Sequence, residues 1–476
     1  MEVLTPDICV IGAGSGGLSV AAAAAAFGVS VVLIERDQMG GDCLNTGCVP
    51  SKALLAAAKR VEAIRDAGRF GLKTQRVTVD FRAVRAHVRE VIAAVAPNDS
   101  KERFTGLGVR VISGSARFKD ARTVAVEDDI EVKARRFVIA TGSTAAVPPI
   151  PGLEETPYLT NATVFDLAVL PKHLVVIGAG PIGLELAQAF RRLGAEVTVL
   201  EAAQPLAKDD PECAQIVLDQ LERDGVVLRA GVRIASVAKV RTRIVVTLAA
   251  DGGADGETIE ATHLLVAAGR RPVVDGLDLD KAGIAVEPRG IVVDDGLRTA
   301  NKRVYAIGDV AGGLQFTHVA NAHAGVVIRS ALFRLPAKFK SDAVPWVTFT
   351  EPELAQVGLT EAQARTKHKR LRILRWPYHE NDRAQAECTT TGHIKVITTD
   401  RGVILGVTIV GAGAGEMISL WTLAIARRLN IRAMTEFIVP YPTLAEVGKR
   451  AAISYFTPRL TTSFVRRIIA FSRWFG

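Results

Sequence analysis

The sequence predicts an α/β protein with two Rossmann-like units and a smaller α+β domain after them. Three observations predict this. A strand–glycine turn–helix–strand pattern begins at Ile8, and the same pattern returns at Val175. After Pro345 the chain changes to short β-rich runs (347–349, 393–398 and 403–410), followed by helical segments. With 476 residues, 49% of them hydrophobic, the chain is long enough for roughly three domains.

The repeated pattern carries the same spacing in both copies. Residues 8–18 read ICVIGAGSGGL and residues 175–184 read VVIGAGPIGL. Each copy continues into an apolar helix and a second apolar run that ends in an acid, Glu35 in the first and Glu201 in the second. The acid follows the first glycine by 23 residues in both (35 − 12 and 201 − 178). Two such copies, each between a strand and a helix, predict two dinucleotide-binding units.

The first copy also contains 27 residues without a charge, Ile8 to Ile34, which by length alone could span a membrane. Five glycines divide this stretch into strand, turn, helix and strand, so we expect no membrane span here. The preceding residues contain Glu2 and Asp7 and no Lys or Arg, which argues against a signal peptide.

Composition bears on the partners and on the redox compartment that we expect for the protein. The formal net charge is +9, which could attract nucleic acid, anionic lipid or acidic partners. A solvated arginine-rich surface also explains the charge, and we find no nucleic-acid motif. The five cysteines are an odd number without a disulfide framework, which favours a reducing, cytoplasmic setting.

Two of the cysteines form a motif directly after the first unit. Residues 40–52 read GGDCLNTGCVPSK, which places Cys43 and Cys48 close enough to form a disulfide. A structural disulfide over so short a loop would add little stability to a fold of this size. The pair therefore suggests a dithiol that exchanges electrons with a bound redox cofactor.

This segment resembles the redox-active stretch of the class I pyridine nucleotide-disulfide oxidoreductases, a family that includes dihydrolipoamide dehydrogenase, glutathione reductase and mercuric reductase. The resemblance runs from about Asp7 to about Ala452. It implies a glutathione reductase-like fold and a homodimer. The implied division is an FAD-binding domain at 1–148 and 270–340, an NAD-binding domain at 149–269, a dimerisation domain at 341–455 and a basic amphipathic tail at 456–476.

The resemblance implies FAD and NAD as cofactors. For FAD it indicates Gly12, Gly14, Gly17, Glu35, Lys52, Ala116, Thr141, Gly142, Ser143, Asp309, Phe316, Thr317 and His318, and for the nicotinamide cofactor Gly178, Gly180, Gly183, Glu201 and Gly269. A carboxylate at Glu201 accepts a hydrogen bond from a free ribose 2′-hydroxyl and repels a 2′-phosphate, which favours NADH over NADPH. Glu201 could also be an acid that merely ends a strand.

By the same resemblance, Cys48 lies against the flavin and Cys43 faces the substrate. Lys52 and Glu185 resemble the ion pair beside the flavin. The catalytic His–Glu of the dihydrolipoamide and glutathione enzymes is changed here, because residues 441–446 read YPTLAE. Tyr441 occupies the His position and Glu446 the Glu position, each expected to act in the partner subunit's site. A phenol titrates near ~10 and is a poor base at neutral pH, so we expect weak dihydrolipoamide dehydrogenase activity. Tyr441 could also be no more than an interface aromatic.

Two alternatives to a disulfide or lipoyl-type substrate stay open. Mercuric reductase also has Tyr near this position, and residues 381–384 (NDRA) are similar to that branch. That enzyme ends in a vicinal cysteine pair, whereas no cysteine follows Cys388 here, and no resident metal site is predicted.

The other alternative is a membrane-associated redox-sensing or electron-donor module at the inner membrane face. Residues 457–476 intersperse arginines with Phe, Ile and Trp, as in a basic amphipathic helix lying on an anionic membrane. A helix packed on the protein's own surface would also explain this pattern.

Overall fold

The computed structural model describes residues 2–249, 256–460 and 462–475. Residues 250–255 of the expected NAD-binding domain, and 461 and 476 of the expected tail, lie outside these ranges. The first unit is built on a parallel sheet with the strand order β20-β8-β2-β3-β4. Its strands are β2 (Ile8–Ile11), β3 (Val31–Glu35), β4 (Arg110–Ser113), β8 (Arg136–Ile139) and β20 (Val304–Ala306).

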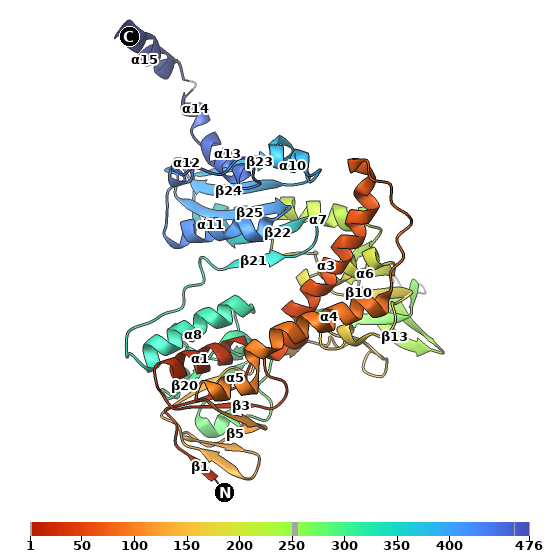
Figure 1. The fold of residues 1–476 in the computed structure, drawn as a ribbon, viewed down its shortest axis with the longest axis vertical. Helices are drawn as coiled ribbons and strands as arrows, with labels where there is room; N and C mark the ends of the chain where they lie inside the picture. The colour runs from red at the N-terminus through yellow and green to blue at the C-terminus, as the bar shows by residue number, and fades with distance from the viewer. Residues whose placement is uncertain (1, 250–255, 461, 476) are drawn as a thin grey trace.

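Both faces of this sheet are covered, so its strands are continuous apolar runs. One face packs on α1 (Ser15–Ala26) and α8 (Thr317–Ala331), which lie side by side (Figure 1). The other face packs on a second sheet with the order β1-β7-β6-β5. The strands of that sheet are β1 (Glu2–Leu4), β5 (Ala116–Asp120), β6 (Thr123–Val126) and β7 (Ile130–Val132).

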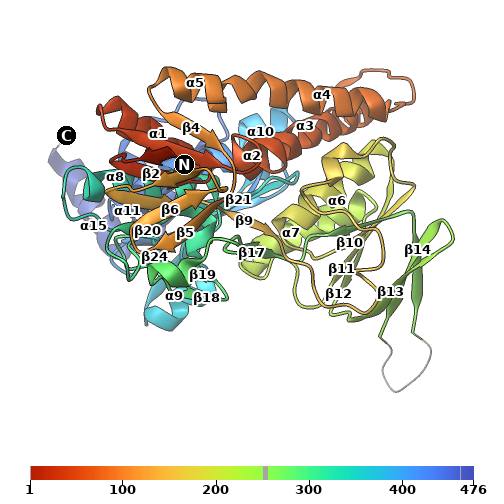
Figure 2. The ribbon, with the colours of Figure 1, turned by 90° about the horizontal axis from the view of Figure 1, so that it is seen from below.

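The cysteine motif folds into the helices that follow β3. The short helix α2 (Gly41–Asn45) contains Cys43, and α3 (Cys48–Arg65) begins at Cys48. From there α3 runs beside α4 (Phe81–Val95) toward the second unit, where it packs on α6 (Pro181–Leu193) (Figure 2). The helix α5 (Lys101–Gly106) leads into β4.

The second unit repeats the first on a smaller scale. Its parallel sheet has the order β12-β11-β10-β16 and packs on α6 and α7 (Pro211–Arg223). An antiparallel sheet, β13-β14-β15, covers the other face, an addition to the βαβ unit that the sequence predicted. The short ribbon of β9 and β17 lies where the chain leaves and re-enters the first unit. These strands are β9 (Ser143–Ala145), β10 (His173–Ile177), β11 (Glu196–Glu201), β12 (Val227–Ala230), β13 (Ile234–Val240), β14 (Arg243–Leu248), β15 (Thr258–Ala261), β16 (His263–Val266) and β17 (Arg270–Pro272).

The C-terminal part is an antiparallel sheet with helices. Its order is β21-β22-β25-β24-β23, where the sequence predicted only β21, β24 and β25. Its core is closed by Trp421 of α11 and Val447 of α13. The strands are β21 (Pro345–Thr348), β22 (Glu353–Gly358), β23 (Leu371–Pro377), β24 (His393–Thr399) and β25 (Ile404–Gly411), and the helices are α9 (Glu361–Lys367), α10 (Asp382–Ala386), α11 (Ala414–Ala426), α12 (Ala433–Glu436) and α13 (Glu446–Ser454).

Beyond this part, α14 (Thr457–Leu460) and α15 (Ser463–Ser472) extend away from the rest of the chain (Figure 1). Within the described residues, no helix combines the length and the apolarity that crossing a membrane requires. The remaining short elements are β18 (Val286–Glu287), β19 (Gly290–Ile291) and the 3₁₀ turns η1 (Asp66–Phe70), η2 (Ala96–Asp99), η3 (Val164–Asp166), η5 (Leu279–Ala282), η6 (Gly308–Ala311), η7 (Tyr378–Glu380) and η8 (Arg473–Phe475).

Candidate active site

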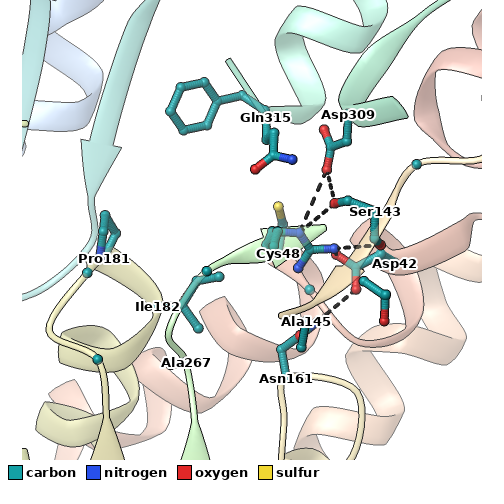
Figure 3. Close-up of a pocket in the computed structure, with 18 of the residues that line it drawn as sticks. Asp42, Cys48, Ser143, Ala145, Asn161, Pro181, Ile182, Ala267, Asp309 and Gln315 are labelled. Carbon is teal, nitrogen blue, oxygen red and sulfur yellow. Dashed lines mark hydrogen bonds and ion pairs between the residues drawn. The ribbon is translucent and has the colours of Figure 1, made fainter. Parts of the chain in front are cut away.

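A cavity of about 2450 Å³ is lined by both parallel-sheet units and reaches the C-terminal sheet. Both glycine turns, the cysteine motif and the N-terminus of α8 line it. Figure 3 shows Cys48, Asp42 and Ser143 on one side, with Pro181 and Ile182 of α6 on the other. The two glycine turns, 166 positions apart in the sequence (178 − 12), therefore face one continuous space.

The first glycine turn is shaped by contacts that only glycine allows. A Cβ on Gly12 would lie 2.5 Å from the Ala140 carbonyl oxygen, and one on Gly17 would lie 1.9 Å from the Gly12 carbonyl oxygen. At Gly14 the nearest heavy atom would be the Gly41 Cα at 4.0 Å, so the space above its backbone is open. This open space faces the cavity at the N-terminus of α1, where a pyrophosphate can approach the backbone.

The second glycine turn has the same construction. A Cβ on Gly178 would lie 2.5 Å from the Ala267 carbonyl oxygen, and one on Gly183 would lie 2.1 Å from the Gly178 carbonyl oxygen. A Cβ on Gly180 would meet nothing within 4 Å. The backbone at the N-terminus of α6 is therefore exposed to a ligand as it is at α1.

Each unit places its acid beside its own glycine turn. Glu35 accepts a hydrogen bond from the Ala13 backbone N–H at 2.5 Å, and Glu201 accepts one from the Ala179 N–H at 2.7 Å. Glu201 also accepts from the Ala203 N–H at 2.9 Å. Both carboxylates line the cavity at the ends of β3 and β11, the position from which an acid contacts the ribose.

The two motif cysteines are free thiols in direct contact. Cys48 is exposed to the cavity and Cys43 is half-buried. The Cys43 S–H donates a hydrogen bond to Cys48, which is the main cause that lowers the pKa of Cys48, and burial opposes it. Thr317, whose Oγ1 lies 3.6 Å from the Cys48 Sγ, and the charge of Lys52 also lower this pKa, so that its net value is about 6.

The same hydrogen bond and burial raise the pKa of Cys43. Cys48 is thus the thiolate of the pair, at the first position of an 18-residue helix whose dipole favours negative charge.

Lys52 and Glu185 join three parts of the chain beside this pair. The Lys52 Nζ lies 2.8 Å from the Glu185 Oε2, and the Glu185 side chain is only 6% exposed. The other carboxylate oxygen of Glu185 accepts from the Phe349 N–H at 2.9 Å, and the Lys52 Nζ lies 4.3 Å from the centre of the Phe349 ring. The ammonium of Lys52, four residues after Cys48, is therefore held at a fixed place in the cavity wall.

A polar network that sequence analysis missed surrounds Asp309. Ser143 donates to the Asp309 Oδ2 at 2.5 Å, and the Arg270 Nε donates to the Ser143 Oγ at 2.7 Å. Arg270 also reaches the Asp42 carboxylate at 3.1 Å, and the Asn161 amide donates to Asp42 at 2.8 Å (Figure 3). Burial raises the pKa of Asp309. The quoted cysteine motif contained Asp42 but gave no reason to pair it with Arg270, and nothing in the sequence singled out Asn161.

Three further expected FAD contacts and Gly269, expected to contact the nicotinamide cofactor, also line the cavity. Thr141 donates to the Val273 carbonyl at 2.7 Å, and Gly142 next to it has a φ of +72°. Ala116 begins β5 and is 7% exposed. Gly269 lies at the entry to β17 with a φ of +128°, a conformation that strains other residues.

The segment before α8 presents aromatic rings and a helix start to the cavity. The Phe316 and His318 rings stack with centroids 5.2 Å apart. His318 is hydrogen-bonded to the Pro345 carbonyl at 2.8 Å, which ties this segment to β21. Thr317 begins α8 next to Cys48, so the positive end of the α8 dipole faces the thiolate.

Tyr441 and Glu446 do not line this chain's cavity. Tyr441 is 70% exposed, and its hydroxyl donates to the Asp382 Oδ2 at 2.7 Å. This hydrogen bond and the charge of Asp382 raise the pKa of the Tyr441 phenol. The cavity of one chain therefore contains every predicted site residue except these two and the packing glycines Gly17 and Gly183.

Comparisons with known proteins show to which family the chain belongs. Residues 6–324 match the family model of the pyridine nucleotide-disulphide oxidoreductases, and residues 344–452 match the dimerisation domain of the same family. The chain is 36% identical over 455 residues to a mercuric reductase of Lysinibacillus sphaericus, covering 94% of this chain and 82% of that protein. It is 35% identical over 458 residues to dihydrolipoyl dehydrogenase 3 of Pseudomonas aeruginosa, covering 94% and 97%.

Among solved structures, the HOCl-induced flavoprotein disulfide reductase RclA from Escherichia coli, as its Cu(II) complex, superposes with a TM-score of 0.85. The two chains are 27% identical, and the match covers 94% of this chain and 99% of that one. Members of the matched family bind FAD and use NAD(P)H. The chain belongs to the class I pyridine nucleotide-disulfide oxidoreductases.

Proposed function

We propose that this protein uses NADH and FAD to reduce a disulfide substrate, or oxidises a dithiol in the reverse direction, through Cys43 and Cys48. The observation that carries the proposal is the Cys43–Cys48 contact, with Cys48 as the thiolate, inside the cavity lined by both glycine turns. An unreactive structural cysteine would be buried with a raised pKa, as Cys9 and Cys213 are.

FAD fits the first unit, which we assign to 1–148 and 270–340. The open backbone at Gly14 is a cradle that a Cβ would fill, and Glu35 stands beside it for the ribose. Asp309 provides an acceptor for the ribityl chain, Ser143 holds Asp309 in place by donating to it, and Lys52 supports negative charge on the ring. When bound, FAD supplies a centre that accepts a hydride from a nicotinamide and exchanges two electrons with a disulfide.

NADH fits the second unit, 149–269, for the corresponding reasons. The open backbone at Gly180 can approach a pyrophosphate, and Glu201 offers a carboxylate for the 2′-hydroxyl. No basic residue follows directly, since residues 202–204 are Ala, Ala and Gln. A 2′-phosphate would meet the Glu201 carboxylate, which supports NADH as the preferred nucleotide.

The sulfur chemistry balances as a two-electron exchange. The Cys43 proton passes to the Cys48 thiolate along their hydrogen bond, and the Cys43 thiolate attacks one sulfur of the substrate disulfide. The first substrate thiolate leaves and takes the proton from Cys48. The Cys48 thiolate then attacks Cys43 and forms the Cys43–Cys48 disulfide, and the second substrate thiolate leaves and takes up a proton from water. One disulfide is reduced and one is formed. NADH returns the Cys43–Cys48 pair to the dithiol by supplying two electrons.

The substrate end of the site is completed by a second copy of this chain, through the dimerisation domain at 341–455. In that homodimer, Tyr441 and Glu446 reach the partner's Cys43. Asp382 keeps Tyr441 protonated by holding its pKa above the usual range, so Tyr441 donates a hydrogen bond and does not accept the Cys43 proton. Oxidation of dihydrolipoamide needs a base at the position of Tyr441. Because Tyr441 stays protonated, we expect slow turnover of dihydrolipoamide.

The test is NADH-driven reduction of small disulfides and lipoamide by the FAD-loaded enzyme and its Cys43→Ser variant. We expect the wild type to oxidise NADH in step with thiol release. The variant should still bind FAD and NADH and release no thiol. Equal thiol release by both proteins would contradict the proposal.

Reduction of a soft metal ion is a second candidate, which the identity to mercuric reductases favours. No cluster of three or more metal-binding side chains occurs in the described parts of the chain, so the ion would meet Cys43 and Cys48 as a substrate. Anaerobic titration with mercuric ion and NADH separates the two functions. Turnover of many equivalents indicates a metal reductase, whereas loss of activity after one equivalent indicates trapping at the dithiol.

A further inference from the structure

The C-terminal helix α15 presents an apolar face that is exposed among the described residues. The apolar residues Phe464, Ile468 and Phe471 recur at the spacing of one helix face, and Phe475 of η8 continues that face. The rings of Phe471 and Phe475 are in edge-to-face contact, with centroids 5.2 Å apart. These two side chains are 66% and 78% exposed, and Trp474 between them is 89% exposed.

The opposite face of the same helix is basic. Arg466 of α15 lies on that face beside the exposed Ile469, Arg473 at the start of η8 continues it, and Arg467 lies at its border with the apolar face. After Glu446 the sequence contains no acid and six basic residues, Lys449, Arg450, Arg459, Arg466, Arg467 and Arg473. Positive charge is therefore concentrated at this end of the chain, next to exposed aromatic residues.

The C-terminal tail lies apart from the active site and from the matched dimerisation domain. The match to the dimerisation domain ends at residue 452, before α14 and α15 begin. Figure 1 shows α15 standing away from the sheets, and apart from Val465 the described residues 462–475 are all exposed. A ten-residue helix without packing is marginal in water, so α15 needs a surface to cover its apolar face.

We propose that α15 docks on an anionic lipid surface. A helix with aromatic and aliphatic residues on one face and arginines on the other lies in the interface of a bilayer, with the apolar face among the acyl chains. The arginines then contact anionic headgroups, and the absence of acids after Glu446 removes repulsion. Charge complementarity selects this partner over a neutral apolar groove. The inference is independent of the proposed redox function.

The test is co-sedimentation of the FAD-loaded full chain with vesicles of phosphatidylcholine plus phosphatidylglycerol, compared with phosphatidylcholine alone. We expect binding to the anionic vesicles that weakens as salt is added, and little binding to the neutral ones. Arg466→Glu with Arg467→Glu should weaken binding at least about 25-fold, a factor of about five for each arginine. A matched pair of reversals on exposed helix positions elsewhere, Arg60→Glu with Arg82→Glu, should change it little.

The apolar face has a matched control as well. Phe471→Ser with Phe475→Ser should reduce vesicle binding at least about tenfold, because burial of two aromatic rings is lost. Phe27 and Phe333 form a similar exposed edge-to-face pair with centroids 5.1 Å apart, and their replacement by Ser should leave binding unchanged. Flavin absorbance of each variant confirms that it is folded.

Three results would overturn the proposal. The first is equal pelleting of the full chain and of a chain ending at Tyr455. The second is binding that is independent of lipid charge and salt. The third is a full chain that does not bind vesicles and whose dimer, measured by sedimentation velocity, is lost when α15 is removed. That result would mean that α15 docks on a second copy of the chain.

Discussion

The two glycines at the start of α6 should respond in opposite ways to the same added methyl group. At Gly183 a Cβ would lie 2.1 Å from the Gly178 carbonyl oxygen, a backbone atom that cannot rotate away. At Gly180 a Cβ would meet nothing within 4 Å, and the backbone there has a φ of −79° that any residue adopts. Gly183→Ala should therefore damage the fold, and Gly180→Ala should damage only ligand binding.

The expected loss of stability at Gly183 and the expected loss of NADH affinity at Gly180 follow from these distances. Overpacking of this kind costs about 2–3 kcal/mol, which lowers the unfolding midpoint of the second unit by roughly 4–12 °C. At Gly180 the methyl group would occupy the space through which the pyrophosphate approaches the backbone. Losing one charge-assisted hydrogen bond of about 1.5–3 kcal/mol weakens NADH binding roughly 10- to 100-fold.

The assay is thermal unfolding together with the NADH dissociation constant from anaerobic rapid mixing. FAD content is the control, because the first glycine turn is unchanged in both variants. Binding of NADH by Gly180→Ala as tightly as by the wild type, or unfolding of Gly183→Ala at the wild-type temperature, would contradict this prediction.

Three further predictions concern the acid, the thiolate and the phenol. Glu201→Ala should raise the NADPH-to-NADH ratio of kcat/KM roughly tenfold or more by removing repulsion of the 2′-phosphate, and an unchanged ratio in steady-state kinetics would contradict this. In the reduced enzyme the long-wavelength thiolate absorbance should be present at neutral pH and fade as pH falls through about 6, because the lowered pKa of Cys48 keeps it charged above that value. Lys52→Met should move that midpoint to higher pH, and an unmoved midpoint would show that Lys52 does not act on the thiolate. Tyr441→His should raise lipoamide turnover at least about tenfold, with no gain expected if Tyr441 is only an interface aromatic.

The glycine turns and acids could be predicted from the sequence because their geometry is local. Gly12 and Glu35 belong to one strand–turn–helix–strand unit, and the spacing of 23 residues alone brings the acid beside the turn. The second copy repeats the construction at Gly178 and Glu201. A local pattern of this kind can be recognised in the sequence without knowledge of the tertiary fold.

The Arg270 network could not be predicted because its members come from separate segments. Arg270, Asp42 and Asn161 meet only after the β9–β17 ribbon has brought the second unit against the cysteine motif. The strand β22 of the C-terminal sheet was missed for another reason. β22 lies between β21 and β25 and is largely buried, so its residues lack the polar–apolar alternation that marks a half-exposed strand.

The central claim is that two electrons are held by the Cys43–Cys48 pair in addition to those held by the cofactor. Anaerobic reductive titration of the FAD-loaded protein counts them directly. We expect uptake of four electrons per FAD, with a long-wavelength absorbance after the first two that Cys48→Ser abolishes. Uptake of only two electrons by the wild type, with no such absorbance at any stage, would contradict it.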